Sequence, residues 1–308
     1  MNIYGDTGLP LCANGSAPTG GTFKTGMDGV HGILAQDMRQ RLKRGGYTHV
    51  MFMAMGWYND QRVSICRYRE IAKQVGAAMA QHGTGFHPLV VGMTWPSSWA
   101  AGSGSKVVQE IGHISSVLNK ATDSDEAGIL YGNIILNRVI PHANTADLPE
   151  VVIGHSMGTR LGGQAVFGRD LLKQGPEGGP ATLAVFLQPA HSAYRYTQSG
   201  GNEGNPFYGA ARVGTRVVVT TAYNDRANPV AFWSPYVGGL WGMWLAKSKT
   251  NSFHSVEFGD DQTQAEAAIR ATPPGKVMLA QLGFLTKHGD ILSDGMGRFI
   301  AALIRGVD

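Results

Sequence analysis

The sequence predicts a doubly wound α/β protein in which a mostly parallel β-sheet is flanked by helices. Short apolar runs, without the alternation of a half-exposed strand, recur along the chain, and segments of helical periodicity lie between them. Strands that alternate with helices in this way form parallel sheets covered on both faces. Such sheets bind ligands at the carboxyl ends of their strands, so we expect a site in the loops that follow them.

Six apolar runs are interpreted as strands. They cover residues 49–57, 87–95, 150–156, 182–190, 215–225 and 275–284. A first helix is predicted to end at Gly45-Gly46, where the preceding cations complement the helix dipole. Further helices are predicted over a segment with Ile65, Tyr68, Ile71, Ala72 and Val75 on one face, over 107–119, 125–141 and 157–173, and from about Asp290 onward.

Composition and charge are those of a globular protein. The chain of 308 residues is long enough to bury a large core, and 43% of its residues are hydrophobic while 16% are charged. The net charge of +4 is spread along the chain, and its one dense cluster, Arg39 to Arg44, is interpreted as a helix end, so no nucleic-acid partner is expected. No apolar run approaches the roughly 20 residues that cross a bilayer, so no membrane span is expected.

The sequence lacks the patterns that would indicate a metal, a dinucleotide cofactor or a secretory leader. The ten histidines and two cysteines show no metal-ligand spacing, and no G-x-G-x-x-G follows an early strand, so neither a metal nor another cofactor is expected. Whether Cys12 and Cys66 pair is left open, as is the oligomeric state. Because no leader is visible, the cytoplasm is the default location; a protein whose leader had been removed would be secreted or periplasmic.

The segment VVIGHSMGTRLGGQA contains the pattern Gly154-His155-Ser156-Met157-Gly158. A G-x-S-x-G pattern arises easily by chance in a chain with 43 glycines, but this one stands directly between a predicted strand and a predicted helix. In a nucleophile elbow, the two glycines let strand and helix approach around a strained turn that raises the serine hydroxyl above the sheet. Ser156 is therefore the candidate nucleophile, and His155 is interpreted as a packing residue.

The candidate acid is Asp225. A serine nucleophile needs a histidine base and a carboxylate that orients the base, and in this architecture they follow the serine in the order acid, then histidine. Asp225 ends the predicted strand 215–225, where the carboxyl edge of the sheet is expected; a turn-capping role is the alternative. Asp260 and Asp261 are rivals, although their surroundings are typical of a loop before a helix.

The candidate base is His288. It stands in the segment LGFLTKHGDILSDG, between the last predicted strand and the last predicted helix, with loop-forming neighbours. His254 and then His191 are the alternatives, and Asp290 is predicted to cap the last helix.

Two backbone N–H groups are candidates for an oxyanion hole. One is that of Met157, directly after the nucleophile, and the other is expected in the loop after the first long strand. In that loop Gly56 lets the backbone approach a substrate, and Trp57 is the expected second donor. The alternative is that Gly56 merely ends the strand.

Five segments together resemble the α/β-hydrolase serine esterases, most closely a bacterial subgroup with a strand-W-P-S motif and a G-H-S-M-G motif. They are HVMFMAMGWYND, VGMTWPSSW, VVIGHSMG, VVVTTAYNDRA and KHGDI, in the order of that family. The resemblance covers about residues 47–305 and implies a single α/β-hydrolase domain over 1–308, whose glycine-rich N-terminal segment, 1–45, resembles nothing identified.

The resemblance implies a Ser156, Asp225 and His288 triad with Trp57 and Met157 as oxyanion donors. Trp95, in the TWPSSW motif, is a candidate for contact with substrate. One position departs from the family: Met55 stands where histidine commonly precedes the oxyanion glycine, which puts the hydrogen bonds that stabilise this loop in doubt.

The predicted activity is hydrolysis of a small-molecule carboxylic ester through an acyl-enzyme on Ser156. The alternatives are acyl transfer or perhydrolysis by the same triad, and a non-catalytic binding protein on the same fold. Acyl and alcohol preferences are not indicated.

Residues 228–253 are expected to form an aromatic cap over the site. The segment begins just after the candidate acid and contributes Trp233, Trp241 and Trp244 as candidate substrate-binding residues. The alternative is a surface excursion whose aromatic side chains pack on flanking helices.

Overall fold

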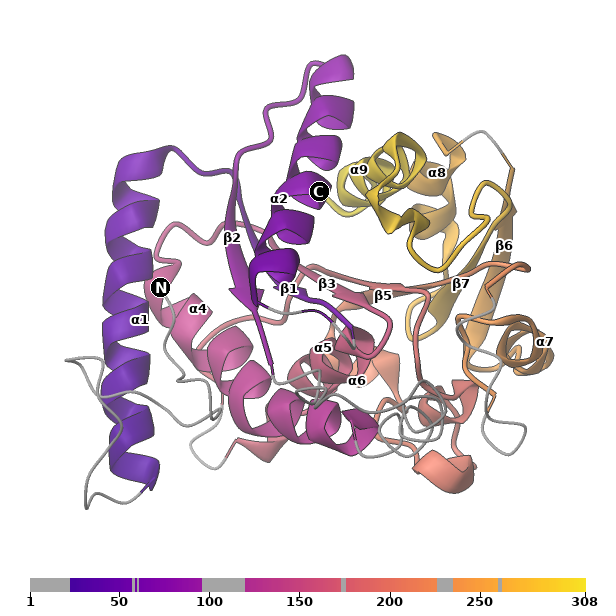
Figure 1. Ribbon diagram of the computed structural model, residues 1–308, viewed down its shortest axis with the longest axis horizontal. Coiled ribbons are helices and arrows are strands. Elements are labelled where there is room, and N and C mark those ends of the chain that lie inside the picture. The colour runs from indigo at the N-terminus through magenta and orange to yellow at the C-terminus, as the bar shows by residue number, and fades with distance from the viewer. Residues whose placement is uncertain are drawn as a thin grey trace, which may run out of the picture.

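A seven-stranded, entirely parallel sheet forms the centre of the computed structural model (Figure 1). The structure describes residues 23–56, 59, 61–95, 120–172, 176–225, 235–259 and 262–308. Across the sheet the strand order is β2-β1-β3-β4-β5-β7-β6. The strands are β1 (His49–Ala54), β2 (Pro88–Met93), β3 (Glu150–His155), β4 (Leu183–Leu187), β5 (Arg216–Thr221), β6 (Phe253–Phe258) and β7 (Val277–Leu282).

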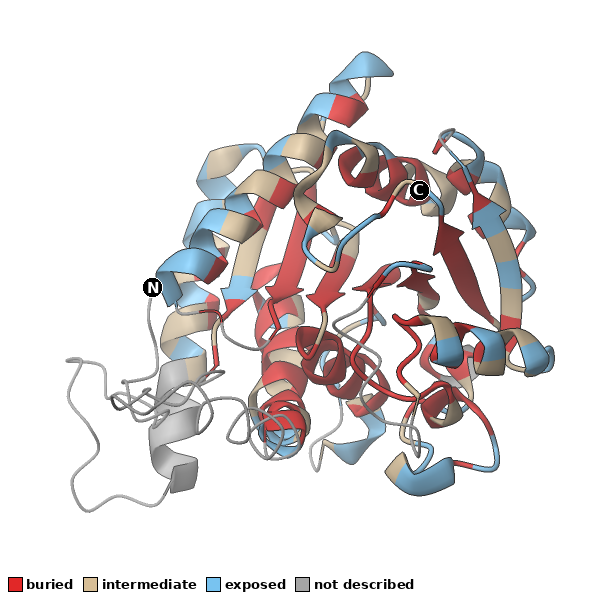
Figure 2. Ribbon diagram, turned by 45° about the vertical axis from the view of Figure 1, so that its right-hand side comes forward, coloured by how far each residue is buried: buried red, intermediate tan, exposed pale blue. Residues whose placement is uncertain are grey.

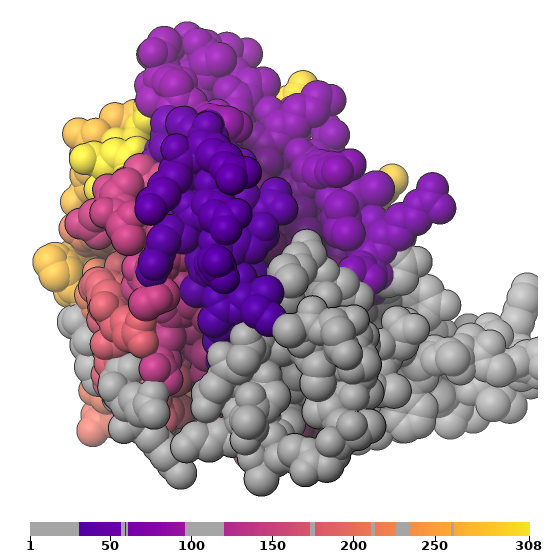
Figure 3. Space-filling view, turned by 90° about the vertical axis from the view of Figure 1, so that its left-hand side faces the viewer, coloured from indigo at the N-terminus to yellow at the C-terminus, as the bar shows by residue number. Residues whose placement is uncertain are grey.

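Helices cover both faces of the sheet and enclose a separate apolar core on each side. One face carries α2 (Gln61–Gln81), α8 (Gln264–Ala271) and α9 (Asp294–Val307). The other carries α1 (Phe23–Gly45), α5 (Gly158–Phe167) and a helix over 120–143 that includes the π-helical segments η1 (Gly128–Gly132) and η2 (Ile135–Val139) and ends as α4 (Ile140–Ala143). α1 packs beside α4 along one side of the molecule, the side that faces the viewer in Figure 3.

Short elements lie in the connections between the strands. They are η3 (Arg169–Leu171), η4 (Ala193–Tyr196), η5 (Gly201–Glu203), α6 (Ala210–Val213), α7 (Leu240–Ser248) and η6 (Asp290–Leu292). Among the helices that the structure describes, we find none with the length and apolar character needed to cross a membrane.

Burial explains why the inner strands read as unbroken apolar runs. Every residue of β1, β4 and β7 is buried, because helices cover both sides of these strands. The edge strands β2 and β6 have partly exposed residues between buried ones (Figure 2). The chain first builds outward from β1 to β2 and then crosses back to β3, and this all-parallel order confirms the predicted α/β-hydrolase fold.

The structure differs from the sequence prediction at three elements, of which one is α7, a helix in a segment where none was predicted. β6 is a seventh strand, which was not predicted because its sequence, FHSVEF, has a polar face and only its two ends are buried. The last helix begins at Asp294 with Ser293 as its cap, because the Ser293 hydroxyl accepts the Met296 N–H; Asp290 was the predicted cap. The first helix ends at Gly45, as predicted.

Several predictions fall outside the described residues. They concern Cys12, Trp57, Trp233, Asp260, Asp261 and the helix over 107–119. Cys66 is described, as an exposed free thiol on α2.

Glu150, the first residue of β3, makes the stability of the sheet depend on pH. One carboxyl oxygen accepts a hydrogen bond from Asn144, and burial raises the pKa of the group to about 7. The acid form is thus favoured in the folded state. The contribution of Glu150 to the free energy of unfolding should therefore be fully present below the ordinary pKa of 4.5 and be lost as the pH rises through 7.

Glu150→Gln should remove this loss. The amide keeps an acceptor for Asn144 and carries no charge, so at pH 8 we expect the variant to exceed wild type in free energy of unfolding by roughly 1–3 kcal/mol. At pH 4 the two should be alike. Chemical denaturation at both pH values measures the difference, and an identical pH dependence in the two proteins would contradict the prediction.

Candidate active site

Ser156 occupies a left-handed turn between β3 and α5. Its φ is +54°, a region that residues other than glycine rarely adopt. Its N–H donates to the Leu187 carbonyl at 3.0 Å, so the turn begins while the chain is still paired with β4. The Ser156 carbonyl accepts the Thr159 N–H at 3.1 Å and the Thr159 hydroxyl at 2.5 Å, which starts the helix at once. The serine side chain thus stands at the carboxyl edge of the sheet, partly exposed.

Gly56 and Gly158 are required by close packing around this turn. The register of β1 and β3 pairs Ala54 with Gly154, which puts Gly56 beside Ser156. A Cβ at position 56 would lie 2.6 Å from the Ser156 Cβ and 3.1 Å from its Oγ. A Cβ at position 158 would collide with the backbone of Ala54. Only glycine fits at either position, so the two segments meet backbone to backbone.

His288 and Asp225 form a hydrogen-bonded pair near the end of β3. The His288 Nδ1 lies 2.8 Å from Asp225 Oδ2, and the aspartate side chain is fully buried while the histidine is 22% exposed. Because the carboxylate only accepts, the proton of a neutral His288 ring is on Nδ1, which leaves Nε2 free to accept. The His288 ring packs at 4.7 Å, centroid to centroid, against that of His155, the residue before Ser156. The structure therefore brings the three predicted triad residues to one edge of the sheet.

The turn that carries His288 is closed by Asp290. Its Oδ2 accepts the N–H groups of Thr286 and Lys287 and the Thr286 hydroxyl, each at 2.8 Å. Burial alone would raise the pKa of Asp290, but these hydrogen bonds outweigh it and lower the pKa below the ordinary value. Asp290 thus caps the turn rather than the last helix.

The loop that carries Gly56 is held by hydrogen bonds with three side chains, those of Tyr68, Trp95 and Asn59. The Met55 N–H donates to the Tyr68 hydroxyl at 3.3 Å, and the Met55 carbonyl accepts the Trp95 indole N–H at 2.8 Å. The Asn59 amide donates to the Gly56 carbonyl at 2.9 Å. Trp95, a predicted substrate contact, is 7% exposed and lies against this loop.

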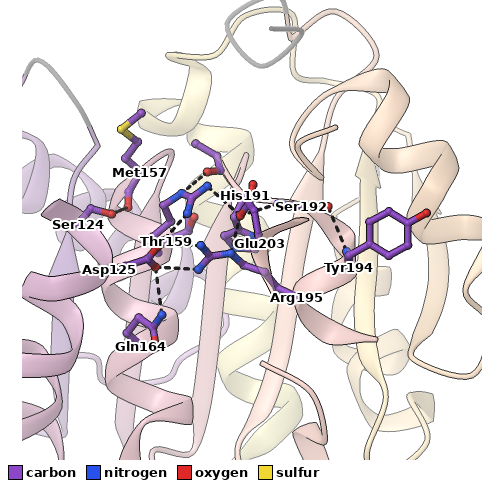
Figure 4. Close-up of polar contacts among 12 residues, drawn as sticks. Ser124, Asp125, Met157, Thr159, Gln164, His191, Ser192, Tyr194, Arg195 and Glu203 are labelled. Atoms are coloured by element: carbon purple, nitrogen blue, oxygen red, sulfur yellow. Dashed lines mark hydrogen bonds and ion pairs between the residues drawn. The ribbon is translucent and has the colours of Figure 1, made fainter. Parts of the chain in front are cut away.

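An ion-pair cluster of two buried arginines and two partly buried carboxylates lies at the start of α5 (Figure 4). We call Asp125, Arg160, Arg195 and Glu203 the four-ion cluster. Arg195 binds both oxygens of Asp125 at 2.7 Å, and its Nε donates to Glu203 at 2.6 Å. Arg160, in the first turn of α5, donates to Asp125 at 2.9 Å and to Glu203 at 2.8 Å, and its Nε reaches the Ala190 carbonyl at 2.7 Å.

The four-ion cluster links segments that are distant in sequence. Burial alone would raise the pKa of Asp125, but the two arginines outweigh it and lower the pKa below the ordinary value. Nearby, the Ser124 hydroxyl donates to the Met157 carbonyl at 3.1 Å. The cluster and this bond fix the start of α5 against the helix over 120–143 and the loop after β4.

The other histidines proposed from the sequence lie elsewhere. His191 is fully buried in an aromatic cluster with Phe207 and Tyr196, and burial, then the neighbouring arginines, lower its pKa well below the ordinary value. His254 lies on the edge strand β6, paired in register with Met278.

Trp241 and Trp244 are both exposed on α7, by 59% and 60%, with ring centroids 6.2 Å apart. α7 begins after Gly238, which accepts the Ala222 N–H at 3.3 Å and donates to the Pro189 carbonyl at 3.1 Å. The segment just before α7 is therefore anchored by hydrogen bonds at the ends of β4 and β5.

Some residues that shape the site were not identified from the sequence. They are Asn59, Tyr68, Asp125, Arg160, Gln188, Arg195 and Glu203. One of them could have been noticed in the sequence, because Gln188 is a polar residue directly after a fully apolar strand. Asp125 lies 35 positions from Arg160 and 70 positions from Arg195 in sequence, and no local pattern connects them.

Comparison with known proteins adds no family assignment. No family model and no curated protein match the chain. Among solved structures it is similar to TT1662 from Thermus thermophilus, with a TM-score of 0.42 and 12% identity over 84% of this chain and 89% of that one. It is also similar to phospholipase PlaB from Legionella pneumophila in complex with thio-NAD, with a TM-score of 0.31 and 12% identity over 62% of this chain and 41% of that one.

A further similar structure is Entamoeba histolytica arginase in complex with L-ornithine, with a TM-score of 0.33 and 9% identity over 83% of this chain and 98% of that one. Likenesses of this strength add nothing about function. The fold assignment therefore rests on the order and direction of the strands, and functional inference on the site itself.

Proposed function

We propose that the chain is a serine hydrolase that cleaves carboxylic esters through an acyl-enzyme on Ser156, with Asp225 and His288 as the acid and base. The observation that carries this proposal is the 2.8 Å pair between His288 and a fully buried Asp225, with the His288 ring packed against His155, the residue before a serine whose φ is +54°. A strained serine, a free imidazole nitrogen and a buried orienting carboxylate are what acyl transfer to serine requires.

In the proposed reaction, His288 Nε2 takes the Ser156 hydroxyl proton while Oγ attacks the ester carbonyl carbon. The tetrahedral intermediate collapses as the carbon–oxygen bond to the alcohol breaks, and His288 gives the proton to the leaving alkoxide. A water molecule then attacks the acyl-enzyme and gives its proton to His288. Release of the acid returns that proton to Ser156. Asp225 holds the ring in the required tautomer and stabilises the imidazolium.

The Met157 N–H is the proposed oxyanion donor. It follows the nucleophile at the start of α5, where backbone N–H groups lack helical partners. Among the described residues, no acceptor is recorded for this N–H, which supports its availability. The second donor remains proposed at Trp57, after Gly56.

Acyl transfer to an alcohol or to peroxide is the alternative outcome of the same acyl-enzyme. Product analysis with competing alcohols and with peroxide separates these outcomes from hydrolysis.

Labelling of Ser156 tests the proposed function directly. A fluorophosphonate phosphonylates an activated serine oxygen, so we expect the wild-type protein to be labelled and Ser156→Ala to stay unlabelled and to hydrolyse p-nitrophenyl esters only at the background rate. Mass spectrometry of the modified peptide locates the adduct. An unlabelled wild-type protein, or equal labelling of Ser156→Ala, would overturn the proposal.

Asp225→Asn tests the acid. The amide side chain keeps the shape of the carboxylate but lets His288 adopt the wrong tautomer, so kcat should fall by roughly 10³-fold or more with little change in melting temperature. Steady-state kinetics and thermal unfolding measure the two effects. Asp260→Asn and Asp261→Asn serve as controls that keep activity; loss of activity in either, with Asp225→Asn near wild type, would show that the acid is misassigned.

Trp241 and Trp244 are proposed to contribute an apolar wall for the substrate. Their exposure on a helix anchored beside the ends of β4 and β5 supports this role. Trp241→Ala and Trp244→Ala should each raise KM about tenfold for aryl or long-chain esters and less than twofold for acetate esters. Equal changes for all esters, or loss of stability alone, would indicate a packing role.

A further inference from the structure

Two side chains outside the triad donate to consecutive carbonyl groups of the turn that carries His288. We call residues 286–290 the base turn. The His155 Nε2 lies 3.1 Å from the His288 carbonyl oxygen, and the Gln188 Nε2 donates to the Lys287 carbonyl at 3.4 Å. The donors come from neighbouring strands: His155 is the last residue of β3, and Gln188 directly follows β4.

Gln188 also contacts the acid. Its Nε2 donates to Asp225 Oδ2 at 3.2 Å, the same oxygen that accepts the proton of His288 Nδ1 at 2.8 Å. An amide nitrogen carries two hydrogens, so one group can serve the carboxylate and the Lys287 carbonyl together. This single side chain therefore connects the loop of the acid with the turn of the base.

The backbone of Gln188 is strained in the way that functional residues often are. Its φ is +43°, and it is fully buried. The β3 and β4 register pairs His155 with Leu187, so Gln188 lies beside Ser156, which also has a positive φ. The Gln188 N–H donates to the Thr220 hydroxyl at 2.9 Å, which holds the turn in place.

His155 is suited to donate from Nε2. A carbonyl oxygen only accepts, so the proton of its neutral ring is on Nε2. Burial, followed by the neighbouring His288, lowers the pKa of His155 well below the ordinary value and keeps the ring neutral.

We propose that His155 and Gln188 are positioning residues that seat the base turn and keep His288 aligned between Asp225 and Ser156. This inference rests on the proposed function for its consequence in catalysis, and on the geometry alone for its consequence in the fold. Neither side chain is assigned contact with substrate.

The test compares Gln188→Met and His155→Phe with a matched control, Gln164→Met. Gln164 is another buried glutamine that donates to a carboxylate at 3.2 Å, that of the partly buried Asp125, and it lies two turns into α5. Methionine and glutamine both carry a Cβ and have similar length, so the strain at position 188 is unchanged. His155→Phe keeps a ring against His288 and removes the donor, whereas His155→Gln restores an N–H of similar reach.

Two readouts separate positioning from simple stability. The first is kcat against KM with a p-nitrophenyl ester; the second is the rate at which the proton between His288 and Asp225 exchanges with water, followed by its low-field NMR signal. We expect Gln188→Met and His155→Phe to lower kcat about tenfold or more, to leave KM within about twofold, and to speed this exchange about tenfold. Gln164→Met should change melting temperature alone, and His155→Gln should recover most of kcat.

The outcomes distinguish this inference from the proposed function. If Gln188→Met and His155→Phe behave like Gln164→Met, with kcat and proton exchange unmoved, the positioning role is overturned. A second outcome is that the wild-type protein neither hydrolyses esters nor reacts with a fluorophosphonate, while the exchange still accelerates in these two variants. The proposed function then fails, and the role of His155 and Gln188 in positioning the base turn is kept.

Discussion

The left-handed turn at Ser156 is the constraint around which the neighbouring segments are arranged. A φ of +54° at a serine costs free energy, of the order of 1–2 kcal/mol, that the surrounding contacts must offset. Pairing of the Ser156 N–H with Leu187 and of its carbonyl with Thr159 holds the turn from both sides. This geometry requires glycine at positions 56 and 158, because a Cβ at position 56 would collide with Ser156 and one at position 158 with the backbone of Ala54.

The four-ion cluster stabilises the other side of the same turn. Burying two arginines and partly burying two carboxylates carries a desolvation cost, and such groups offset it only when nearly every donor and acceptor is used. Here Asp125 receives both guanidinium groups, and both also reach Glu203. The directional bonds define how α5, the helix over 120–143 and the loop after β4 meet, a relation that apolar contacts alone would leave adjustable.

The fold, and the convergence of Ser156, Asp225 and His288 at one edge of the sheet, could be predicted because each depends on local sequence. Ser156 directly follows an apolar run, Asp225 and His288 each lie a few residues beyond one, and a parallel sheet collects such positions at one edge. β6 escaped prediction because an edge strand with a polar face resembles a loop. Gln188 and Arg160 escaped because their roles are set by partners brought near by the crossing order of the strands, which no spacing in the sequence reveals.

That crossing order also explains why β4 contributes to a site in which it supplies no triad residue. The sheet places β4 between β3, which carries Ser156, and β5, which leads to Asp225, with β7 and His288 beyond. A residue that directly follows β4 therefore stands between the nucleophile and the acid. A glutamine there offers two N–H groups, and a positive φ turns the chain at the level where Ser156 turns. In the proposed hydrolase, alignment of His288 thus depends on β4 as much as on β3 and β5, the strands that lead to Ser156 and Asp225.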